Sequence, residues 1–545
     1  MKKIWDYFRR HDRGWVLSLF AAVCIVYLPF LGSPFVFDDL PFFSGNIVEH
    51  YTHWPFQFEL RWLPYASLGW TAAVFSDVLS YPFRLGNLLL HAANVILLFF
   101  LLRRLVAVAI ADNRESPAII RGAWLGALVF AIHPVAVYAV GYVIQRSILM
   151  ATLFSLLALM AYLKGLEQAS RRWLWASVAG YFLAVLSKEH AIMLPAVMLA
   201  LTVVAGGTGK ALFHRLWPIY LGCVAVALFV LSQKTGVVGT AYEVYAPQML
   251  EHAEEQTGGG SDHSHLLSIL TQCALFFKYL GLWLVPNPGW MSVDMREHFV
   301  SAWSDWRGWA GVTGFVLYGL LGIRLLLRCR WLGIAGLALL YPWLQFFVEF
   351  SSIRVQEPFV LYRSYLWMPG IMLFSPLLLA KLPSRRALLG VGCAALLLMP
   401  LAWNRLWVFA DNYRLWNDAA LLLRSERESG ADRIFYNRGN AEMAARNWED
   451  AIADFQRAAA LTPQLAPIHY ALGLAYVNAG RYQDGITQFD AAIALTPDDA
   501  RFYLAKGMSL KRLHQDDSAM RQIEKSCELK NMMACVIVQM KLSKK

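Results

Sequence analysis

Long apolar runs separated by short basic clusters fill residues 1–404 of this 545-residue chain. Hydrophobic residues make up 58% of the whole sequence and charged residues only 16%, against roughly 25% in an average soluble domain. A helix needs about 20 mainly apolar residues to cross the roughly 30 Å hydrocarbon core of a bilayer. The pattern predicts an all-α, polytopic transmembrane domain with about eleven spans. These are 15–37, 83–102, 121–138, 147–163, 173–187, 190–207, 211–232, 308–328, 331–350, 364–381 and 386–403.

Basic residues between these runs predict the orientation of the chain. Clusters begin at Lys2, Arg103, Lys164, Lys210, Arg324 and Lys381, and the positive-inside rule places them all in the cytoplasm. A crossing by the run 266–285 would move the later clusters outside, so we expect this run to lie along or re-enter the outer face. Eleven crossings from a cytoplasmic N-terminus then place the C-terminal region outside.

The formal net charge of +11 does not predict a nucleic-acid partner. The basic residues stand at the ends of apolar runs instead of forming a continuous stripe along which phosphates would bind. The first run ends in Phe-Val-Phe-Asp-Asp without a small-residue cleavage site, which favours a retained span over a signal peptide. The seven cysteines show no zinc-site spacing, although Cys527 and Cys535 could form a disulfide in an oxidising compartment.

A repeat of 34 residues follows the apolar region. It relates Gly439, Gly473 and Gly507, and it also relates Trp448 to Tyr482 and Pro463 to Pro497. These residues resemble tetratricopeptide repeats, about three of them over 432–535, with Asp516 in the aromatic place of the third. We therefore expect a transmembrane domain over 1–404, a linker helix over 405–431 and an α-solenoid over 432–545. Such arrays bind peptides or proteins, and a packing platform for the membrane domain is the alternative.

Two adjacent carboxylates, Asp38 and Asp39, follow the first predicted span. Carboxylates at a membrane boundary are unfavourable unless they are solvated, paired or used in chemistry. Transfer of a sugar from a lipid phosphate needs a base that takes the proton of the acceptor hydroxyl. An aspartate at the membrane edge suits that role, and an ordinary interfacial turn is the alternative. The pair would also suit a divalent cation such as Mg²⁺ or Mn²⁺, although the sequence does not require one.

Further polar residues recur at the predicted outer ends of helices. Several on one face suggest a shared cavity, in which basic side chains would stabilise a phosphate leaving group. The phosphate-binding candidates are Arg146, Lys188, Arg354 and Arg363, and the supporting candidates are His133, Gln145, Glu189, Glu357 and Tyr365. We interpret His91 as a polar residue in helix packing in preference to a catalytic residue. The loop 251–265 contains acidic residues and histidines without fixed ligand spacing, so we interpret it as a flexible acidic loop and predict no metal site there.

The ordered set of motifs resembles the transmembrane and tetratricopeptide-repeat O-mannosyltransferases and their bacterial relatives, which belong to the GT-C superfamily. The motifs include Asp38-Asp39, Asn-Leu-Leu-Leu-His91, Ala-Ile-His133-Pro, Val-Ile-Gln145-Arg146-Ser and Leu-Ser-Lys188-Glu189-His. This family tends to show His-Arg-x-Tyr-Leu-Pro before a late span. Here Arg363 and Tyr365 match, while Tyr362 replaces the histidine and two extra residues precede Pro369. The variant is also similar to bacterial enzymes that glycosylate type IV pilins.

The resemblance implies a bacterial inner-membrane glycosyltransferase with a periplasmic repeat domain. Its donor would be a polyprenyl-phosphate sugar and its acceptor a Ser or Thr of an extracytoplasmic protein, held by the repeats. Asp38 or Asp39 would be the base. The alternatives are a non-catalytic membrane scaffold for envelope assembly and a transferase that acts on lipid or polysaccharide. A transporter is disfavoured because no inverted repeat with broken spans is present in the sequence.

Overall fold

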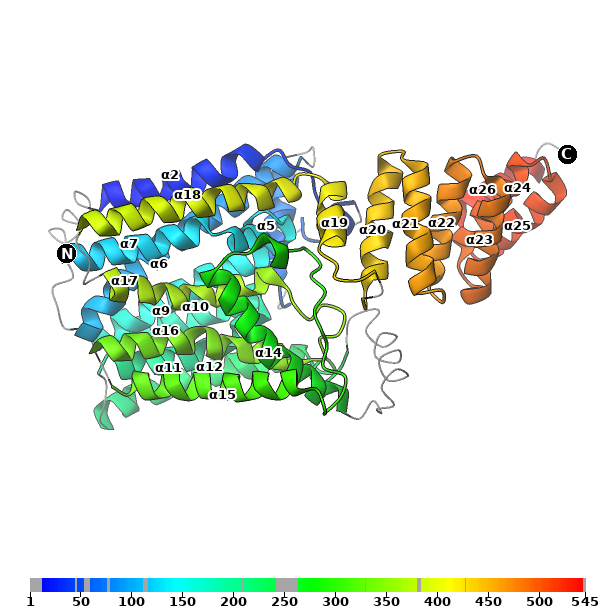
Figure 1. Cartoon of the computed structure of the whole chain (residues 1–545). Helices are drawn as coiled ribbons and strands as arrows, with labels where there is room; N and C mark the ends of the chain where they lie inside the picture. The colour runs from blue at the N-terminus through cyan, green and yellow to red at the C-terminus, as the bar shows by residue number, and fades with distance from the viewer. Residues whose placement is uncertain are drawn as a thin grey trace. The chain divides into compact units, whose positions relative to one another are not determined.

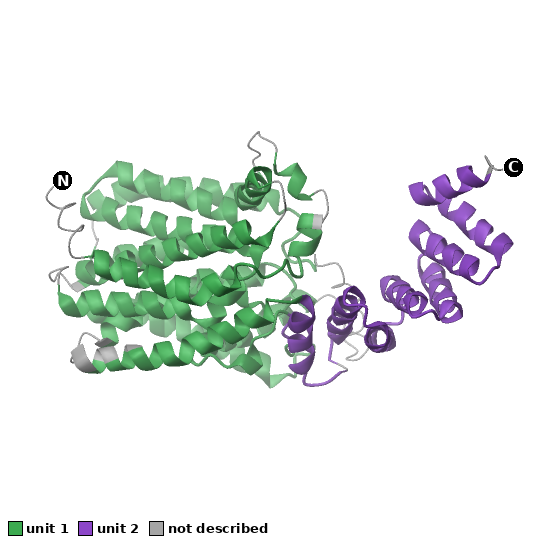
Figure 2. Ribbon diagram, turned by 90° about the horizontal axis from the view of Figure 1, so that it is seen from above, with its two compact units in different colours: residues 1–293, 297–411 green, residues 294–296, 412–545 purple. Residues whose placement is uncertain are grey.

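The computed structural model describes residues 12–44, 47–52, 59–75, 79–110, 116–206, 210–241, 263–328, 330–379, 384–426 and 428–542. These residues form helices joined by turns and loops, with no β-strand among them, and the predicted all-α fold is confirmed. The chain divides into two compact units, which Figure 2 shows in different colours. Unit 1 comprises residues 1–293 and 297–411, and unit 2 comprises 294–296 and 412–545. The boundary at 411/412 lies inside the predicted linker 405–431.

Unit 1 is a bundle whose long helices run side by side in Figure 1. Its α-helices are α2 (Arg13–Tyr27), α3 (Asp39–Ser44), α4 (Ile47–His50), α5 (Trp62–Val74), α6 (Ser80–Ile110), α7 (Pro117–Ile132), α8 (Val137–Val140), α9 (Arg146–Glu167), α10 (Arg171–Ser187), α11 (Leu194–Val204), α12 (Lys210–Gln233), α14 (Ser264–Leu284), α15 (Trp306–Leu326), α16 (Arg330–Phe346), α17 (Phe374–Leu379) and α18 (Ser384–Val408). Short 3₁₀ helices join them. Those near the candidate site are η3 (Val143–Gln145), η4 (Glu189–Met193), η7 (Phe347–Ser351), η8 (Leu361–Leu366) and η9 (Met368–Leu373).

Several of these helices could cross a membrane, which would make the chain a membrane protein. Within the described residues, seven are long and apolar enough, or up to nine if each of two bent pairs is one span. One bent pair is Pro117–Ile132 with Pro134–Val140, which turns by 51°. The bend follows from Pro134, because the residue before a proline is driven out of helical geometry.

Three of the eleven predicted spans form shorter helices than expected, and the run 266–285 also differs from its prediction. The runs 173–187 and 190–207 form α10, of 17 residues, and the short helical segment Glu189–Val204, because the backbone of Lys188 is extended between them. The run 364–381 yields only the short segment Met368–Leu378, in which proline interrupts regular helix. The run 266–285, expected to lie along or re-enter the outer face, forms α14. That helix is itself long and apolar enough to cross, and it runs obliquely to α15 and α16 in Figure 1.

Ion pairs identify the two ends of the bundle in unit 1. Arg103 near the end of α6 pairs with Asp12 before α2 at 2.8 Å, and Arg104 Nε lies 3.0 Å from Glu167 at the end of α9. These contacts place the Arg103–Arg104 cluster beside the start of α2 and the end of α9. The chain leaving α2 reaches Asp39 at the opposite end, where that carboxylate meets the turn that precedes α9. The predicted site residues beside the first span therefore lie far from the basic end.

Unit 2 is a series of antiparallel helix pairs. Its helices are α19 (Asn412–Leu421), α20 (Ala431–Ala444), α21 (Trp448–Leu461), α22 (Ala466–Asn478), α23 (Tyr482–Leu495), α24 (Ala500–Arg512), α25 (Asp516–Glu528) and α26 (Met532–Leu542). The repeated glycines admit a large side chain of the facing helix. Phe455 contacts Gly439, and Phe489 contacts Gly473 in the same way one repeat later. Both rings are fully buried, which agrees with the predicted packing.

A disulfide joins the last two helices of unit 2. Cys527 of α25 and Cys535 of α26 are bonded, with their Cα atoms 4.7 Å apart. The pairing that the sequence allowed is therefore present in the structure.

Candidate functional site

The two adjacent aspartates have opposite environments. Asp39 is fully buried, whereas Asp38 is exposed. The backbone of Phe37 has a φ of 50°, a left-handed turn that is unusual for a large side chain, immediately before the pair. Because the chain turns there, two neighbouring residues of the same type end up in different environments, one exposed and one buried.

Asp39 is a structural carboxylate. The backbone N–H of Ile144 donates to Asp39 Oδ1 at 2.8 Å, and the N–H groups of Val36 and Val143 lie 3.4 Å from Oδ2. Burial raises the pKa of Asp39 to about 7, although Arg84 and these N–H groups act in the opposite direction. Asp39 thus attaches the segment after α2 to the turn before α9.

Asp38 lines a small cavity at this end of unit 1. Its backbone N–H donates to the hydroxyl of Tyr142 at 2.9 Å. The cavity measures about 10 Å³, the room of about one water molecule. It is lined by Phe37, Asp38, Tyr138, Tyr142, Val293, Glu357, Val360, Leu361 and Tyr362. Asp38 and Glu357 are the two carboxylates in its lining, and the side chain of Tyr362 forms part of its wall.

Lys188 lies near the same Tyr362. Its ammonium is 5.5 Å from the centre of the Tyr362 ring, and only 4% of the residue is exposed. Within the part of the chain that the structure describes, this ammonium has neither a hydrogen bond nor an ion pair. Burial, with Arg61 and Arg363 nearby, holds the pKa of Lys188 well below its usual range. A buried cation without a partner is unfavourable, and a bound anion would relieve it.

Glu189, the neighbour of Lys188, already has cationic partners. Arg61 Nε lies 3.0 Å from Glu189 Oε2, and Lys234 Nζ lies 3.8 Å from Oε1. Arg61 precedes α5 and Lys234 follows α12, so this pairing joins three separate segments. Glu189 therefore pairs with Arg61 and Lys234. Among the described residues, the neighbouring Lys188 has no ion pair with it.

Glu349 collects the two predicted arginines of the late loop. Its Oε2 lies 2.9 Å from Arg363 Nη1 and 3.7 Å from Arg354 Nε, and its Oε1 lies 3.3 Å from His190 Nε2. Arg363 also approaches Glu357, which lines the cavity of Asp38, at 3.9 Å. Glu349 is fully buried and was missed in the sequence. A lone carboxylate inside the apolar run 331–350 was the available signal.

Arg146 lies apart from this cluster and is fully engaged by the fold. It donates to Asn87 Oδ1 at 2.9 Å, to the carbonyl of Phe83 at 2.8 Å and to the carbonyl of Ser67 at 3.1 Å. These bonds connect α5, α6 and α9. Its role as a phosphate ligand stays a prediction, and Lys188 is the better placed cation.

The remaining supporting candidates lie inside the helix packing. The Tyr365 hydroxyl is 2.7 Å from His91 Nδ1, and His91 Nε2 is 3.0 Å from the carbonyl of Ala131, so both ring nitrogens of the buried histidine are used. His133 stacks on Trp283 with ring centres 4.5 Å apart. Gln145 is buried in η3, directly after the residues that hold Asp39. These residues order the end of the bundle and do not line the cavity of Asp38.

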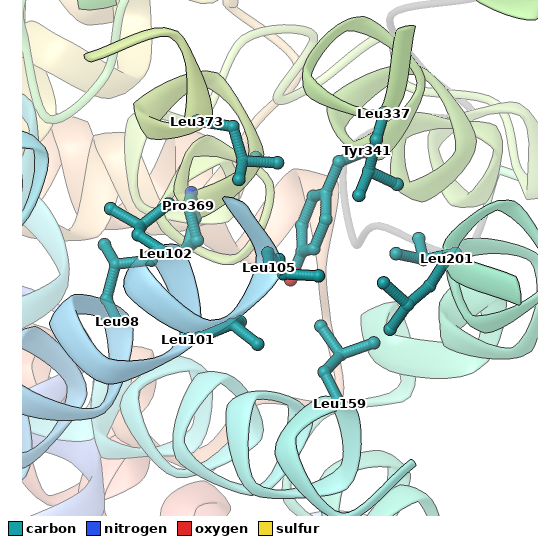
Figure 3. Close-up of a pocket in the computed structure, with 12 residues that line it drawn as sticks. Leu98, Leu101, Leu102, Leu105, Leu159, Leu201, Leu337, Tyr341, Pro369 and Leu373 are labelled. Atoms are coloured by element: carbon teal, nitrogen blue, oxygen red, sulfur yellow. The ribbon is translucent and has the colours of Figure 1, made fainter. Parts of the chain in front are cut away.

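A second cavity lies deeper in unit 1 and has a different lining. Figure 3 shows leucine side chains and the ring of Tyr341 around it, from α6, α9, α11, α16 and η9. It also measures about 10 Å³. Tyr341 is the one titratable residue in its lining, so this cavity has a largely apolar character.

Metal binding has limited support in the described part of the chain. No group of three or more His, Cys, Asp or Glu side chains comes together there. Asp38 and Glu357 line one cavity, so a divalent cation placed there would take most of its ligands from water or a phosphate. Most of the predicted acidic loop 251–265 lies outside the described residues, which resume at 263.

Comparisons with known proteins identify the repeats. A family model described as TPR repeat matches residues 439–480, and one described as tetratricopeptide repeat matches residues 470–524. The predicted tetratricopeptide repeats are therefore confirmed, and they suggest that the chain interacts with other proteins. No curated protein matches the chain.

Solved structures also align with the chain, and MamA and Cut9–Hcn1 are two of them. A crystal structure of MamA aligns at 22% identity over 30% of this chain and 86% of MamA, with a TM-score of 0.20. The APC/C hetero-tetramer Cut9–Hcn1 aligns at 12% identity over 92% of this chain and 91% of the matched chain, with a TM-score of 0.23. Both TM-scores are low, so the repeat assignment rests on the family models and the helix pairs.

Proposed function

We propose that the chain is a membrane glycosyltransferase that moves a sugar from a polyprenyl-phosphate donor to a protein hydroxyl. The observation that carries the proposal is that Tyr362 is near both an exposed carboxylate and a buried cation. Asp38 shares a cavity with this tyrosine, and the ammonium of Lys188 faces its ring. Glycosyl transfer from a lipid phosphate uses a base for the acceptor hydroxyl and a cation for the leaving phosphate, and Tyr362 is near a candidate for each role.

Asp38 is the better base of the two aspartates. It is exposed and lines a cavity, whereas Asp39 is buried and accepts backbone N–H groups. In the proposed step, Asp38 takes the proton of a Ser or Thr hydroxyl. The hydroxyl oxygen forms a bond to the anomeric carbon while the bond from that carbon to the phosphate oxygen breaks. The electron pair of the broken bond leaves with the lipid phosphate.

Lys188 would stabilise the leaving phosphate, whose negative charge grows as the bond breaks. Together with Asp38, the wider cluster has a formal surplus of one positive charge, from five cations and four carboxylates. The cations are Arg61, Lys188, Lys234, Arg354 and Arg363, and the carboxylates are Asp38, Glu189, Glu349 and Glu357. An anion would bring this partly buried cluster closer to neutrality, and the lipid tail would keep that anion at the edge of the apolar helices.

The repeats would hold the acceptor protein on the side of the membrane where Asp38 opens. The resemblance to tetratricopeptide-repeat O-mannosyltransferases supports this arrangement, as does the disulfide of unit 2, because disulfides persist mainly in oxidising compartments outside the cytoplasm. In a bacterium, this location is the periplasmic face of the inner membrane.

The test is the intact mass of envelope proteins from cells that express equal amounts of each variant. Asp38→Asn should slow the addition of a hexose- or pentose-sized mass increment by about 10²–10⁴-fold, as expected for loss of a general base. Lys188→Met should reduce it by about 10²-fold or more. Asp39→Asn should retain most of it, and so should the control Lys164→Met, because Lys164 lies in the last turn of α9, near the opposite end of the bundle, over the Trp173 ring. Unchanged masses in a deletion strain would contradict protein glycosylation.

A non-catalytic scaffold is the second candidate, and the confirmed repeats favour it. Replacement of both aspartates by Asn would leave a scaffold active in envelope assembly, whereas deletion of residues after 432 would abolish that role. A transferase acting on lipid or polysaccharide would lose its sugar product in Asp38→Asn and keep it after the same deletion.

A further inference from the structure

In unit 2, the helices at the two ends of the array differ in how well their apolar side chains are covered. At its N-terminal end, Phe435 and Ala431 of α20 pack with Ala420 of α19 and with Leu423, which covers the first repeat. At its C-terminal end, α26 presents apolar side chains to solvent. Met532 is 83% exposed, Met533 67% and Met540 61%. Large apolar side chains exposed together on one helix mark a candidate interaction surface.

A large cavity opens beside α26, at the red end of the array in Figure 1. It measures about 540 Å³. Its apolar wall is formed by Ala519, Met520 and Ile523 of α25 and by Ile537 and Met540 of α26. Its charged lining comprises Lys511, Lys541 and Asp516. The volume lies within the range of ligand pockets, roughly 300–1,000 Å³, while the methionines suit a surface that adapts to its partner.

The cavity has an origin in the sequence. The helix that corresponds to α25 begins with half-buried Trp448 in the first repeat and with half-buried Tyr482 in the second. In the third repeat, Asp516 takes this place and is exposed. An aspartate fills far less volume than an indole or a phenol, so space remains between α25 and the last turns of α26. The disulfide between Cys527 and Cys535 holds the other ends of these two helices together.

The charges at the cavity select the kind of partner. Neither Lys511 nor Lys541 has an ion pair within residues 428–542 as described. With one aspartate beside two lysines, the lining carries a positive surplus. In the array, each helix packs along the helix before it, and the apolar face of α26 continues that series beyond the last pair. An occupant that satisfies both features is a helix with one apolar face and acidic residues beside it.

We infer that the α25–α26 end of unit 2 is a docking site for an acidic amphipathic helix of a partner protein. The apolar face of that helix packs against Ile537, Met540 and Met520, and its carboxylates pair with Lys511 and Lys541. This site is separate from the chemistry proposed for Asp38 and does not depend on it.

The test uses the full chain in zwitterionic lipid nanodiscs and two fluorescent peptides of about five helical turns. The peptides share one apolar leucine face and differ only in their polar face, which carries Glu in one and Lys in the other. Fluorescence anisotropy, corrected for empty nanodiscs, should show that the Glu peptide binds at least about tenfold more tightly. Met540→Glu should weaken its binding at least about tenfold. The control Met508→Glu, at a 43% exposed methionine outside the cavity, should change it less than about twofold.

Charge reversal gives an independent readout. Lys511→Glu with Lys541→Glu should make the Lys peptide the tighter ligand, which a misfolded end could not do. Equal binding of both peptides, absence of binding, or binding that Met540→Glu leaves unchanged would overturn the inference. Dimers of the wild type that Met540→Glu dissolves would assign the surface to a second copy instead. Loss of binding of the chain to added lipid vesicles in Met540→Glu would assign it to lipid.

Discussion

The two units place their charges in opposite ways. In unit 1, Glu349 and Arg363 form an ion pair whose side chains are 0% and 5% exposed. In unit 2, Arg481 and Asp484 form a pair whose side chains are 46% and 49% exposed. The distances are almost the same, 2.9 Å and 2.8 Å. Since water screens the second pair and not the first, one chemical change should have very different consequences in the two units.

The largest effect should come from Glu349→Gln. This change leaves Arg363, Arg354 and His190 buried without their common carboxylate, which should lower the free energy of unfolding by about 3–5 kcal/mol. The melting temperature of the chain in nanodiscs measures it. The matched control is Glu357→Gln, because Glu357 pairs with the same arginine at 3.9 Å and is 27% exposed. Equal destabilisation by the two variants would mean that burial does not govern the difference.

Removal of the disulfide should have the next largest effect. Cys527 and Cys535 are eight residues apart, and a loop of that size predicts a loss of roughly 2–3 kcal/mol in the local stability of α25 and α26. Hydrogen exchange of α26 amides in Cys527→Ser with Cys535→Ser measures this loss. Cys393→Ser, at an exposed free cysteine of unit 1, is the control. Protection of α26 that stays the same would show that the disulfide adds little to packing.

Asp39 should make the stability of the chain depend on pH. Its pKa is about 7 in the folded chain and about 4 in the unfolded chain, so the folded chain binds more protons between these values. Its contribution to stability is therefore complete below about pH 4 and decreases as pH rises to about 7, by up to about 1.4 kcal/mol per pH unit. Between about pH 5 and pH 7, the melting temperature of Asp39→Asn should decrease less with rising pH than that of the wild type. Two equal slopes for wild type and Asp39→Asn would contradict this assignment.

The smallest effect should come from Asp484→Asn in unit 2. The pair with Arg481 is exposed and lies within one helical turn, so its loss should leave the free energy of unfolding almost unchanged. Hydrogen exchange of α23 at low and high salt measures it, and high salt should remove the difference. A change as large as that of Glu349→Gln would break the contrast between the two units.

Much of the fold could be read directly from residue patterns. The apolar runs predicted helices that unit 1 contains, and the period of Gly439, Gly473 and Gly507 predicted the helix pairs of unit 2. Both predictions depend on spacing along the chain, which a helix converts directly into faces. The span count was less secure, since polar Lys188 and two prolines near residues 369 and 376 interrupt helices inside apolar runs.

The candidate site shows where this kind of prediction ends. Sequence selected Asp38, Asp39, Lys188 and Glu189 as chemically capable residues, because polar groups at the ends of apolar runs are unfavourable without a purpose. It could not separate Asp38 from Asp39, and it did not anticipate Glu349 as the partner of two arginines.

Sequence by itself determined the helical class, the repeats and the set of polar residues available for chemistry. Tertiary structure decided which of these residues are buried or already paired with other side chains and backbone groups. Asp39 is buried because residues 143 and 144 bring their N–H groups to it across more than a hundred positions, and Glu189 is paired because Arg61 and Lys234 reach it from two other segments. The physical reason is that burial and pairing are properties of distant neighbours, whereas spacing along the chain reports only local geometry.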